Sequence, residues 1–228
     1  ENLGKQRSLN EMVSMIDENQ YELTATIDAD TKLDKDWIRN SLKYHRDPNV
    51  AATYGWTLLW EEKSYGDFIN IRRFEYNFLL PVYRTLSNPR SHWTMAGSNV
   101  LYKTSILKKY PVPEDMKENA GEDMLHTVIL QSKGYKIIFV PESVAYSKEE
   151  VDFKGFIKQS GRWFKGTWYV LLNYALKDEI ATKNLTTLYK LQVGAFFTLP
   201  YYEVILNYAL VEGIITKEVG YLMWPLLD

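Results

Sequence analysis

Short buried strands alternate with amphipathic helices along the first 150 residues, and this alternation constrains the fold more than any other feature. Three segments rich in β-branched and aromatic residues predict strands: Tyr21–Asp28, Val50–Trp60 and Tyr135–Pro141. Apolar residues at helical spacing predict the helices between and around them, over Ser8–Asn19, Asp34–His45, Asp67–Leu86 and Asp123–Ser132. A further strand is expected within His92–Lys103, interrupted by Gly97. The alternation predicts an α/β domain with a mostly parallel sheet flanked by helices.

The chain changes character after Asp152. Phe153–Leu176 predicts one long helix that is basic at its start and aromatic later. Leu191–Val211 is apolar and has about the length that a bilayer core requires, with Glu203 as its one formal charge. Pro200 weakens a transmembrane interpretation, and an amphipathic interface helix or a buried helix remains open. We therefore expect three regions: residues 1–150, residues 151–184 and a membrane-associated segment over 185–228.

Charge and cysteine content exclude several classes of function. The formal net charge is −2 and the pI is about 6.0, which argues against nonspecific nucleic-acid binding because such proteins carry a basic excess. The chain has no cysteine. Disulfides, thiolate metal sites and a cysteine nucleophile are therefore ruled out.

Two carboxylates, Asp28 and Asp30, follow a predicted strand in the run TIDADT. At positions i and i+2 their side chains point to the same side of an extended chain. Together they offer the oxygen ligands that a hard divalent cation prefers, with positions left for phosphate oxygens. The alternative is a solvated turn or a helix cap, for which aspartate is equally suited.

Two further runs combine charge with a helix. In GKQRSLN, Gly4 allows close backbone approach to a phosphate and Lys5 supplies charge; the alternative is a surface loop. In GEDML, Asp123 begins a predicted helix, where an acidic residue suits proton transfer or simply caps the helix.

The run QSGRW places Gln159, Arg162 and Trp163 at i, i+3 and i+4, so a helix brings them to one face. A guanidinium group binds phosphate in a bidentate manner, and an indole offers a flat apolar surface for a sugar. The alternative is a tryptophan anchored in the core beside a surface arginine.

Thirty-five residues (124–158) lie between Asp123 and Gln159. This interval and the order GKQRSLN, TIDADT, AGSN, GED and QSGRW resemble the processive family 2 glycosyltransferases, the membrane-linked group of cellulose, chitin and hyaluronan synthases. The resemblance covers about Gly4 to Lys165. Two positions depart from the family pattern, where Gly121 replaces a threonine and Ser160 replaces a basic residue.

The resemblance implies a GT-A-type catalytic domain over residues 1–150, an interface helix region bearing QSGRW over 151–184, and membrane helices after it. It implies that Asp123 is the general base, and that Asp28 and Asp30 bind Mg²⁺ or Mn²⁺ with the donor diphosphate. Other implied roles are donor phosphate binding by Lys5, Gln159 and Arg162, and acceptor binding by Gly97, Ser98, Glu122 and Trp163.

The implied activity is an inverting transfer of a sugar from a nucleotide-diphosphate donor, with a UDP-sugar expected, to a growing polysaccharide. The full protein is expected to be a multi-pass membrane protein with a cytoplasmic catalytic domain. Family members carry a nucleoside-binding aspartate well before the lysine run, so we expect that pocket to come from residues outside this sequence. A single-addition transferase acting on a lipid-linked acceptor and a non-catalytic membrane partner are the alternatives.

Overall fold

The computed structural model describes residues 5–60, 73–114, 121–148, 153–175 and 185–193. The chain divides into two compact units, Glu1–Tyr189 and Lys190–Asp228, and the elements below belong to the first. The predicted boundaries at residues 150 and 184 stay predictions. Most of the predicted membrane segment, Leu191–Val211, lies outside the described residues, as does the start of the predicted helix Asp67–Leu86.

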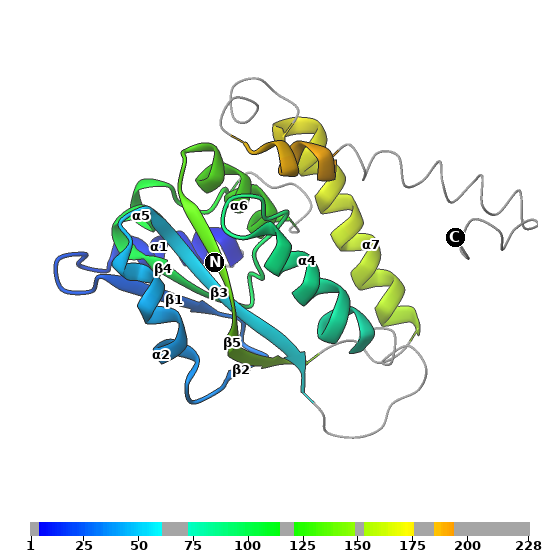
Figure 1. The fold of residues 1–228 in the computed structure, drawn as a ribbon, viewed down its shortest axis with the longest axis horizontal. Helices are drawn as coiled ribbons and strands as arrows, with labels where there is room; N and C mark the ends of the chain where they lie inside the picture. Colours follow the sequence, from blue (N-terminus) through cyan, green and yellow to red (C-terminus); the bar gives the residue numbers. More distant parts are fainter. Residues whose placement is uncertain (1–4, 61–72, 115–120, 149–152, 176–184, 194–228) are drawn as a thin grey trace, which may run out of the picture. The chain divides into compact units, whose positions relative to one another are not determined.

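Five strands form one sheet in the order β1-β4-β3-β5-β2 (Figure 1). Their bounds are β1 Leu23–Ile27, β2 Thr31–Leu33, β3 Val50–Leu59, β4 Asn99–Lys103 and β5 Lys136–Ser147. The three strands predicted from single runs are confirmed as β1, β3 and β5, and the expected strand near Gly97 begins just after it, at Asn99.

The predicted mostly parallel sheet is wrong, because the sheet is mixed. Only β3 and β5 pair in parallel among the described strands; the pairs β1–β4, β3–β4 and β2–β5 are antiparallel. The connection from β3 to β4 contains helices, yet it starts and ends at the same sheet edge, so β4 runs back along β3. Alternation of strands and helices predicts parallel pairing only where each helix carries the chain to the opposite edge.

The sheet is bent, and the link between β1 and β2 shows why it must be. These two strands lie at opposite sides of the five-stranded order, but only residues 28–30 connect them. A flat sheet would separate them by about 19 Å, whereas three linking residues span at most about 15 Å between strand ends. The bend falls where Gly55↔Val140 is followed by Trp56↔Val144, because three extra residues in β5 form a bulge.

Helices cover both faces of the sheet. On β4, Val100 and Tyr102 join the main core, to which Val13 of α1 and Leu130 of α6 contribute. Leu101 faces the other way and packs with Trp37 of α2, as the period-2 alternation of a strand requires. The helices that supply these residues are α1 Lys5–Ser14, α2 Trp37–Leu42, α5 Thr104–Lys109 and α6 Glu122–Ser132.

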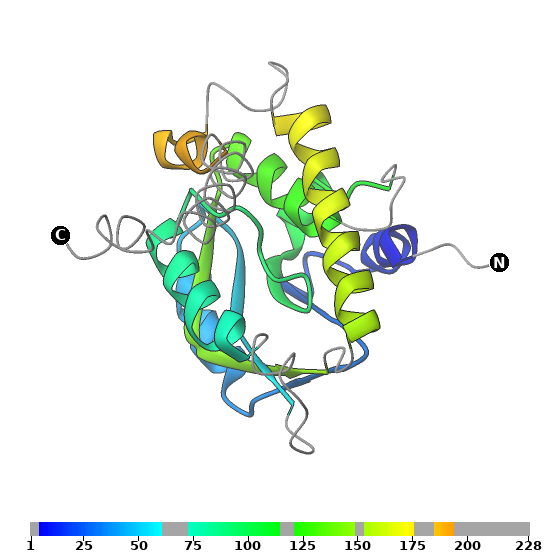
Figure 2. The same cartoon turned by 90° about the vertical axis from the view of Figure 1, so that its right-hand side faces the viewer.

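Two longer helical segments lie near α6 (Figures 1 and 2). One consists of the π-helical turn η2, Glu75–Leu79, and α4, Leu80–Ser87. The other is α7, Phe153–Val170, continued by the π-helical turn η3, Leu171–Ala175, which confirms the long helix predicted there. Within the described ranges, no helix has both the length and the apolar character needed to cross a bilayer.

Candidate active site

One edge of the sheet collects the predicted site residues. Because β1 and β3 are both antiparallel to β4, and β5 is parallel to β3, the carboxyl ends of β1, β3 and β5 lie at the same edge. The amino end of β4 lies there too. Asp28 therefore follows β1 directly beside the residues that precede β4, and its backbone N–H donates to the carbonyl oxygen of Ser98 at 3.1 Å.

Lys5 joins two of the acidic residues at this edge. Its ammonium nitrogen lies 2.8 Å from Asp28 Oδ1 and 3.4 Å from Glu122 Oε1. Burial lowers the pKa of Lys5, but the hydrogen bond to Asp28 and the nearby carboxylates outweigh it and raise the pKa. Lys5 therefore stays charged at neutral pH. The first turn of α1 and the first turn of α6 thus meet at the end of β1.

Asp123 is half-buried at the start of α6, and its carboxyl group is shifted toward the protonated form. Burial raises its pKa to about 6, and the negative charge of Glu122 adds to the rise. Hydrogen bonds from the backbone N–H groups of Met124 and Gly97, and the charge of Lys5, act in the opposite direction. Asp123 is consequently ionised at pH 7 but close to its titration, as suits a general base.

The backbone around Asp123 is fixed by neighbours that the sequence analysis missed. The hydroxyl of Thr127 donates to the Asp123 carbonyl oxygen at 2.6 Å and accepts from the Met95 N–H at 3.0 Å. This side chain therefore ties α6 to the segment that leads into Gly97. A Cβ at Gly97 would lie 3.2 Å from the Asp123 Cβ, so a side chain at this position would require Asp123 to shift by a few tenths of an ångström.

Asn99 is a second missed residue, and it holds β4 in register beside the site. Its Oδ1 accepts from the Gly55 N–H at 2.7 Å and from the Trp37 indole at 3.2 Å. Its Nδ2 donates to Thr57 Oγ1 at 2.9 Å and to Ser98 Oγ at 3.2 Å. The amide is fully buried. A buried asparagine with both groups satisfied positions Ser98, and the asparagine of AGSN was the available signal.

Helix α7 approaches the site through two glycines. Gly121 has φ +88°, and a Cβ there would meet the backbone of Gly166 at 3.1 Å. This explains the glycine at the position where the family pattern has a threonine: a side chain would strain the backbone and push α7 away. Gly166, in the middle of a helix pattern, was a signal of close packing that the sequence analysis did not use.

The QSGRW residues lie on α7, one to two turns before Gly166. Arg162 is exposed, and the Trp163 side chain is 39% exposed, which leaves indole surface open to a ligand. The structure thus brings Lys5, Asp28, Gly97, Ser98, Glu122 and Asp123 together, and it places Gln159, Arg162 and Trp163 on the helix packed against α6. The functional roles of all of them stay predictions.

Asp28 and Asp30 fit a divalent cation as an incomplete ligand set. Both are carboxylates, and Asp30 is exposed at the edge of the sheet. Among the described residues, no group of three or more acidic or histidine side chains forms a metal cluster. Two carboxylates suffice for an ion that takes its other ligands from phosphate oxygens and water, as Mg²⁺ commonly does.

The fold and this acidic edge define a glycosyltransferase of the GT-A-like class. The chain belongs to glycosyl transferase family group 2, whose model matches residues 23–216. The predicted class of enzyme, a glycosyltransferase, is thereby confirmed, while the processive synthase subgroup stays a prediction.

Two known proteins are similar to this chain. The "Probable glycosyltransferase YdaM" of Bacillus subtilis (strain 168) is 30% identical over 81 residues, which are 36% of this chain and 19% of that protein. The chain thus spans about a fifth of this curated relative. The mannosyltransferase PcManGT of Pyrobaculum calidifontis, solved in complex with GDP-Man and Mn²⁺, matches with a TM-score of 0.59 at 20% identity, covering 97% of this chain and 60% of that one. At this identity the likeness shows the fold.

Proposed function

We propose that the protein is an inverting, metal-dependent glycosyltransferase that moves a sugar from a nucleotide-diphosphate donor to the end of a growing polysaccharide at a membrane. The observation that carries the proposal is one compact cluster at the sheet edge. Lys5 bridges Asp28 and Glu122, and Asp123, with its pKa raised to about 6, is the next residue along the chain. A phosphate-binding cation and a proton acceptor therefore lie side by side.

In the proposed reaction, an acceptor hydroxyl oxygen attacks the anomeric carbon while the bond from that carbon to the diphosphate oxygen breaks. Asp123 takes the hydroxyl proton, and the nucleoside diphosphate leaves with the electron pair of the broken bond. A single displacement inverts the anomeric configuration. Gly97 helps to position the Asp123 carboxylate, because its backbone N–H donates a hydrogen bond to it.

Positive charge is required on the opposite side of the reacting carbon, where the diphosphate departs. Lys5, through its position beside Asp28, is proposed to supply this charge, and Arg162 and Gln159 are proposed to add contacts from α7. Asp28 and Asp30 would hold Mg²⁺ or Mn²⁺, which neutralises charge on the leaving diphosphate when bound. The Mn²⁺ in the PcManGT complex supports this choice of metal.

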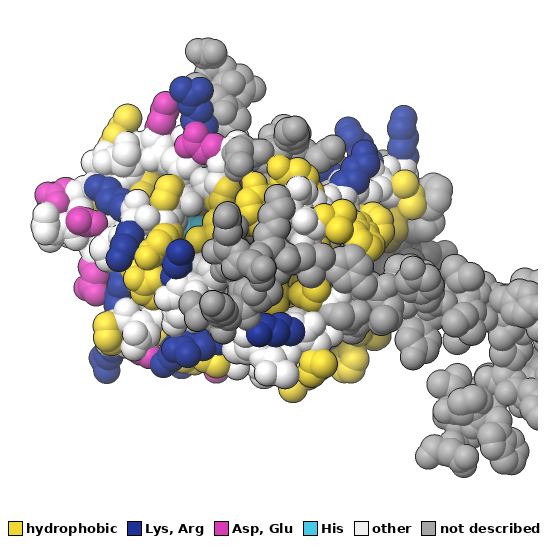
Figure 3. Space-filling model, turned by 90° about the horizontal axis from the view of Figure 1, so that it is seen from above, with side chains coloured by type: hydrophobic (Ala, Val, Ile, Leu, Met, Phe, Trp, Pro, Cys, Tyr) yellow, Lys and Arg dark blue, Asp and Glu magenta, His cyan; other side chains and the backbone are white. Residues whose placement is uncertain are grey.

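The acceptor is proposed to contact Trp163, Glu122 and the Gly97–Ser98 turn. Membrane association is proposed to involve α7, which mixes basic and apolar residues on its exposed surface: Lys154, Ile157, Lys158, Phe164 and Lys165. On the face shown in Figure 3, Lys and Arg side chains lie beside hydrophobic ones in several separate places.

The experiment is incubation of the protein with a panel of UDP-sugars and GDP-mannose, with Mn²⁺ or Mg²⁺, followed by product mass. The family resemblance supports uridine donors, and the GDP-Man bound by PcManGT makes GDP-mannose the main competitor. A ladder of products is expected for a polymerising enzyme, whereas one added sugar would contradict processivity.

Three variants complete this test. Asp28→Ala and Asp123→Asn are expected to abolish transfer, and the exposed Glu142→Gln serves as a control that leaves it unchanged. Failure of every donor to turn over, or full activity in the two aspartate variants, would overturn the proposed function.

A further inference from the structure

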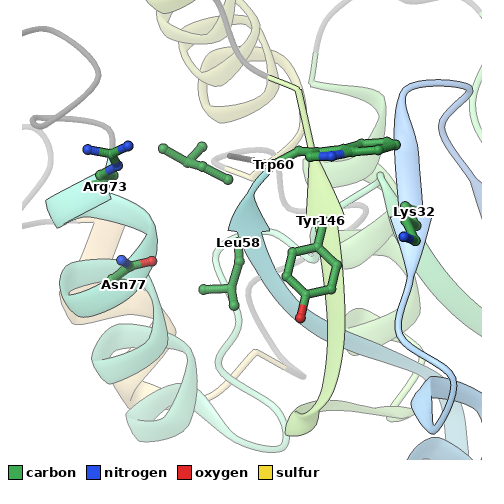
Figure 4. Close-up of a pocket in the computed structure, with 7 residues that line it drawn as sticks. Lys32, Leu58, Trp60, Arg73, Asn77 and Tyr146 are labelled. Atoms are coloured by element: carbon green, nitrogen blue, oxygen red, sulfur yellow. The ribbon is translucent and has the colours of Figure 1, made fainter. Parts of the chain in front are cut away.

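A concave site lies at the same sheet edge, beyond the aspartate segment. It encloses about 380 Å³ between the carboxyl ends of β3 and β5, the strand β2 and the helical segment at η2. Figure 4 shows Leu58, Trp60 and Tyr146 on the strand side and Arg73 and Asn77 on the helix side. This volume lies within the range of pockets that bind small molecules.

The charged side chains among the described residues of the pocket wall are all basic. Lys32 and Arg73 line it, and none of the described side chains in its wall is acidic. A third cation adjoins it, because the ammonium nitrogens of Lys148 and Lys32 lie 5.2 Å and 5.7 Å from the ring centre of Trp60. Two positive charges over one aromatic ring, with Arg73 on the opposite wall of the pocket, favour an anionic ligand with a flat apolar surface.

The pocket adjoins the candidate active site. Lys32 belongs to β2, which begins one residue after Asp30. The backbone N–H of Lys148 donates to the Asp30 carbonyl oxygen at 3.4 Å, so the residue whose ammonium group faces Trp60 also contacts the aspartate segment. Lys5 lies with Asp28 at the other end of this segment. If Lys5 holds the donor diphosphate at one end of the aspartate segment, the pocket near Trp60 at the other end remains accessible to the acceptor.

We infer that this pocket is an acceptor subsite for an anionic sugar, a glycan unit that carries a carboxylate or phosphate group. The name acceptor rests on the proposed function. The indole of Trp60 packs against the sugar ring, and Asn77 and the Tyr146 hydroxyl bond to sugar hydroxyls. Lys32 and Lys148 are exposed and unbranched, so their ammonium groups reach the anion without movement of the backbone.

The test is isothermal titration calorimetry of the protein with four probes: a glucuronic acid trisaccharide, the neutral glucose trisaccharide, glucose 6-phosphate and inorganic phosphate. We expect the charged sugars to bind more tightly than the neutral one. Lys32→Gln and Lys148→Gln should each weaken charged-sugar binding by about tenfold, the size of a charge-assisted hydrogen bond. Trp60→Leu should weaken all three sugars.

Lys109→Gln is the matched control, since Lys109 also lies over an aromatic ring, 5.4 Å from the centre of Tyr110, but outside the pocket. Equal binding of charged and neutral sugars, or equal loss in the control, would overturn the inference. Inorganic phosphate binding as tightly as the sugars would show an anion site without sugar recognition, which also overturns it. The carboxylate and phosphate probes distinguish the two kinds of anionic sugar.

Donor turnover is measured separately, so that the two proposals fail in different ways. Asp123→Asn should lose transfer while it keeps selective binding of the charged trisaccharide. Selective binding without turnover of any nucleotide sugar would refute the proposed function but leave the anionic-sugar site. Turnover by the wild-type protein with no preference for charged over neutral acceptors, or pocket variants that keep the wild-type preference, would refute the subsite only.

Discussion

The two ends of the sheet edge carry opposite charge. At one end, near β1, the carboxylates of Asp28, Glu122 and Asp123 lie around the ammonium group of Lys5. At the other end, near β2, Lys32 and Lys148 lie over Trp60, and no described pocket side chain is acidic. The acidic end suits a metal and a proton acceptor, and the basic end suits an anion. The reaction and the recognition of an anionic substrate can therefore take place at different ends of the same sheet edge.

The two ends also differ in how they are held. Asp123 is half-buried and tied down by Thr127, by Gly97 and by the contact of Gly121 with α7. Lys32 and Lys148 are exposed at their strand ends. Substitutions at the acidic end are thus expected to change the rate of reaction or the stability, and those at the basic end the choice of ligand.

The largest effect is expected for Asp123→Asn. Loss of the proton acceptor should reduce kcat by about 10³-fold, within the range for general base removal. Since burial raises the pKa of Asp123 to about 6, its ionised form disfavours the folded state above that pH. The variant should therefore be at least as stable as the wild type at pH 7, measured by thermal unfolding. An inactive variant with a lowered Tm would instead indicate damage to the fold.

Lys5→Gln should come second, with kcat/KM for the donor reduced about 10- to 100-fold by loss of a charge-assisted contact. The variant should also change the pH dependence of the reaction. Because the charge of Lys5 lowers the pKa of Asp123, its removal should move the acidic limb of the pH–rate profile to higher pH. Lys109→Gln is the control. An unchanged profile would separate Lys5 from the base and restrict it to a structural role.

Gly121→Ala tests how the acidic end is fixed. The substitution places a side chain at φ +88° and a Cβ 3.1 Å from the Gly166 backbone, so we expect a loss of about 2–3 kcal/mol in unfolding free energy. Gly134→Ala is the matched control, because it has φ +85° and nothing within 4 Å of its Cβ, and should cost only about 1 kcal/mol. Equal losses by denaturant unfolding would show that the α6–α7 contact does not matter.

The smallest effect concerns pH. With a pKa of about 6 for Asp123, kcat/KM should be near its plateau at pH 7 and fall about tenfold for each unit below pH 6, as the base becomes protonated. The residual rate of Asp123→Asn should lack this limb. Binding of the glucuronic acid trisaccharide, which stays ionised over this range, should remain constant at the basic end, and a parallel fall there would remove the distinction between the two ends.

The sequence predicted most elements because their patterns are local. β3 was predicted within one residue of its bounds, and the buried run at Tyr135–Pro141 located β5. The prediction of strand direction was wrong, because direction depends on the sheet edge to which each connection returns the chain. β2 was not predicted, because it has only three residues and is defined by its pairing with β5. The part of β5 that pairs with it lies beyond the bulge and was not predicted either.

The site was predicted in part for a related reason. Asp28, Glu122 and Asp123 stand out as charged residues at element ends, and Lys5 as a cation beside a glycine. Their neighbours Thr127 and Asn99 look ordinary in sequence, because their importance comes from hydrogen bonds across the fold. The Trp60 pocket combines four separate segments, so no single run of residues indicates it.

The three-residue link between Ile27 and Thr31 limits how far apart the end of β1 and the start of β2 can lie. It is a tight turn, because the Thr31 N–H donates to the Asp28 carbonyl oxygen at 3.0 Å, so an added or deleted residue would break this turn and shift β2 relative to β5. The distance between the two charged ends is consequently set by the covalent chain.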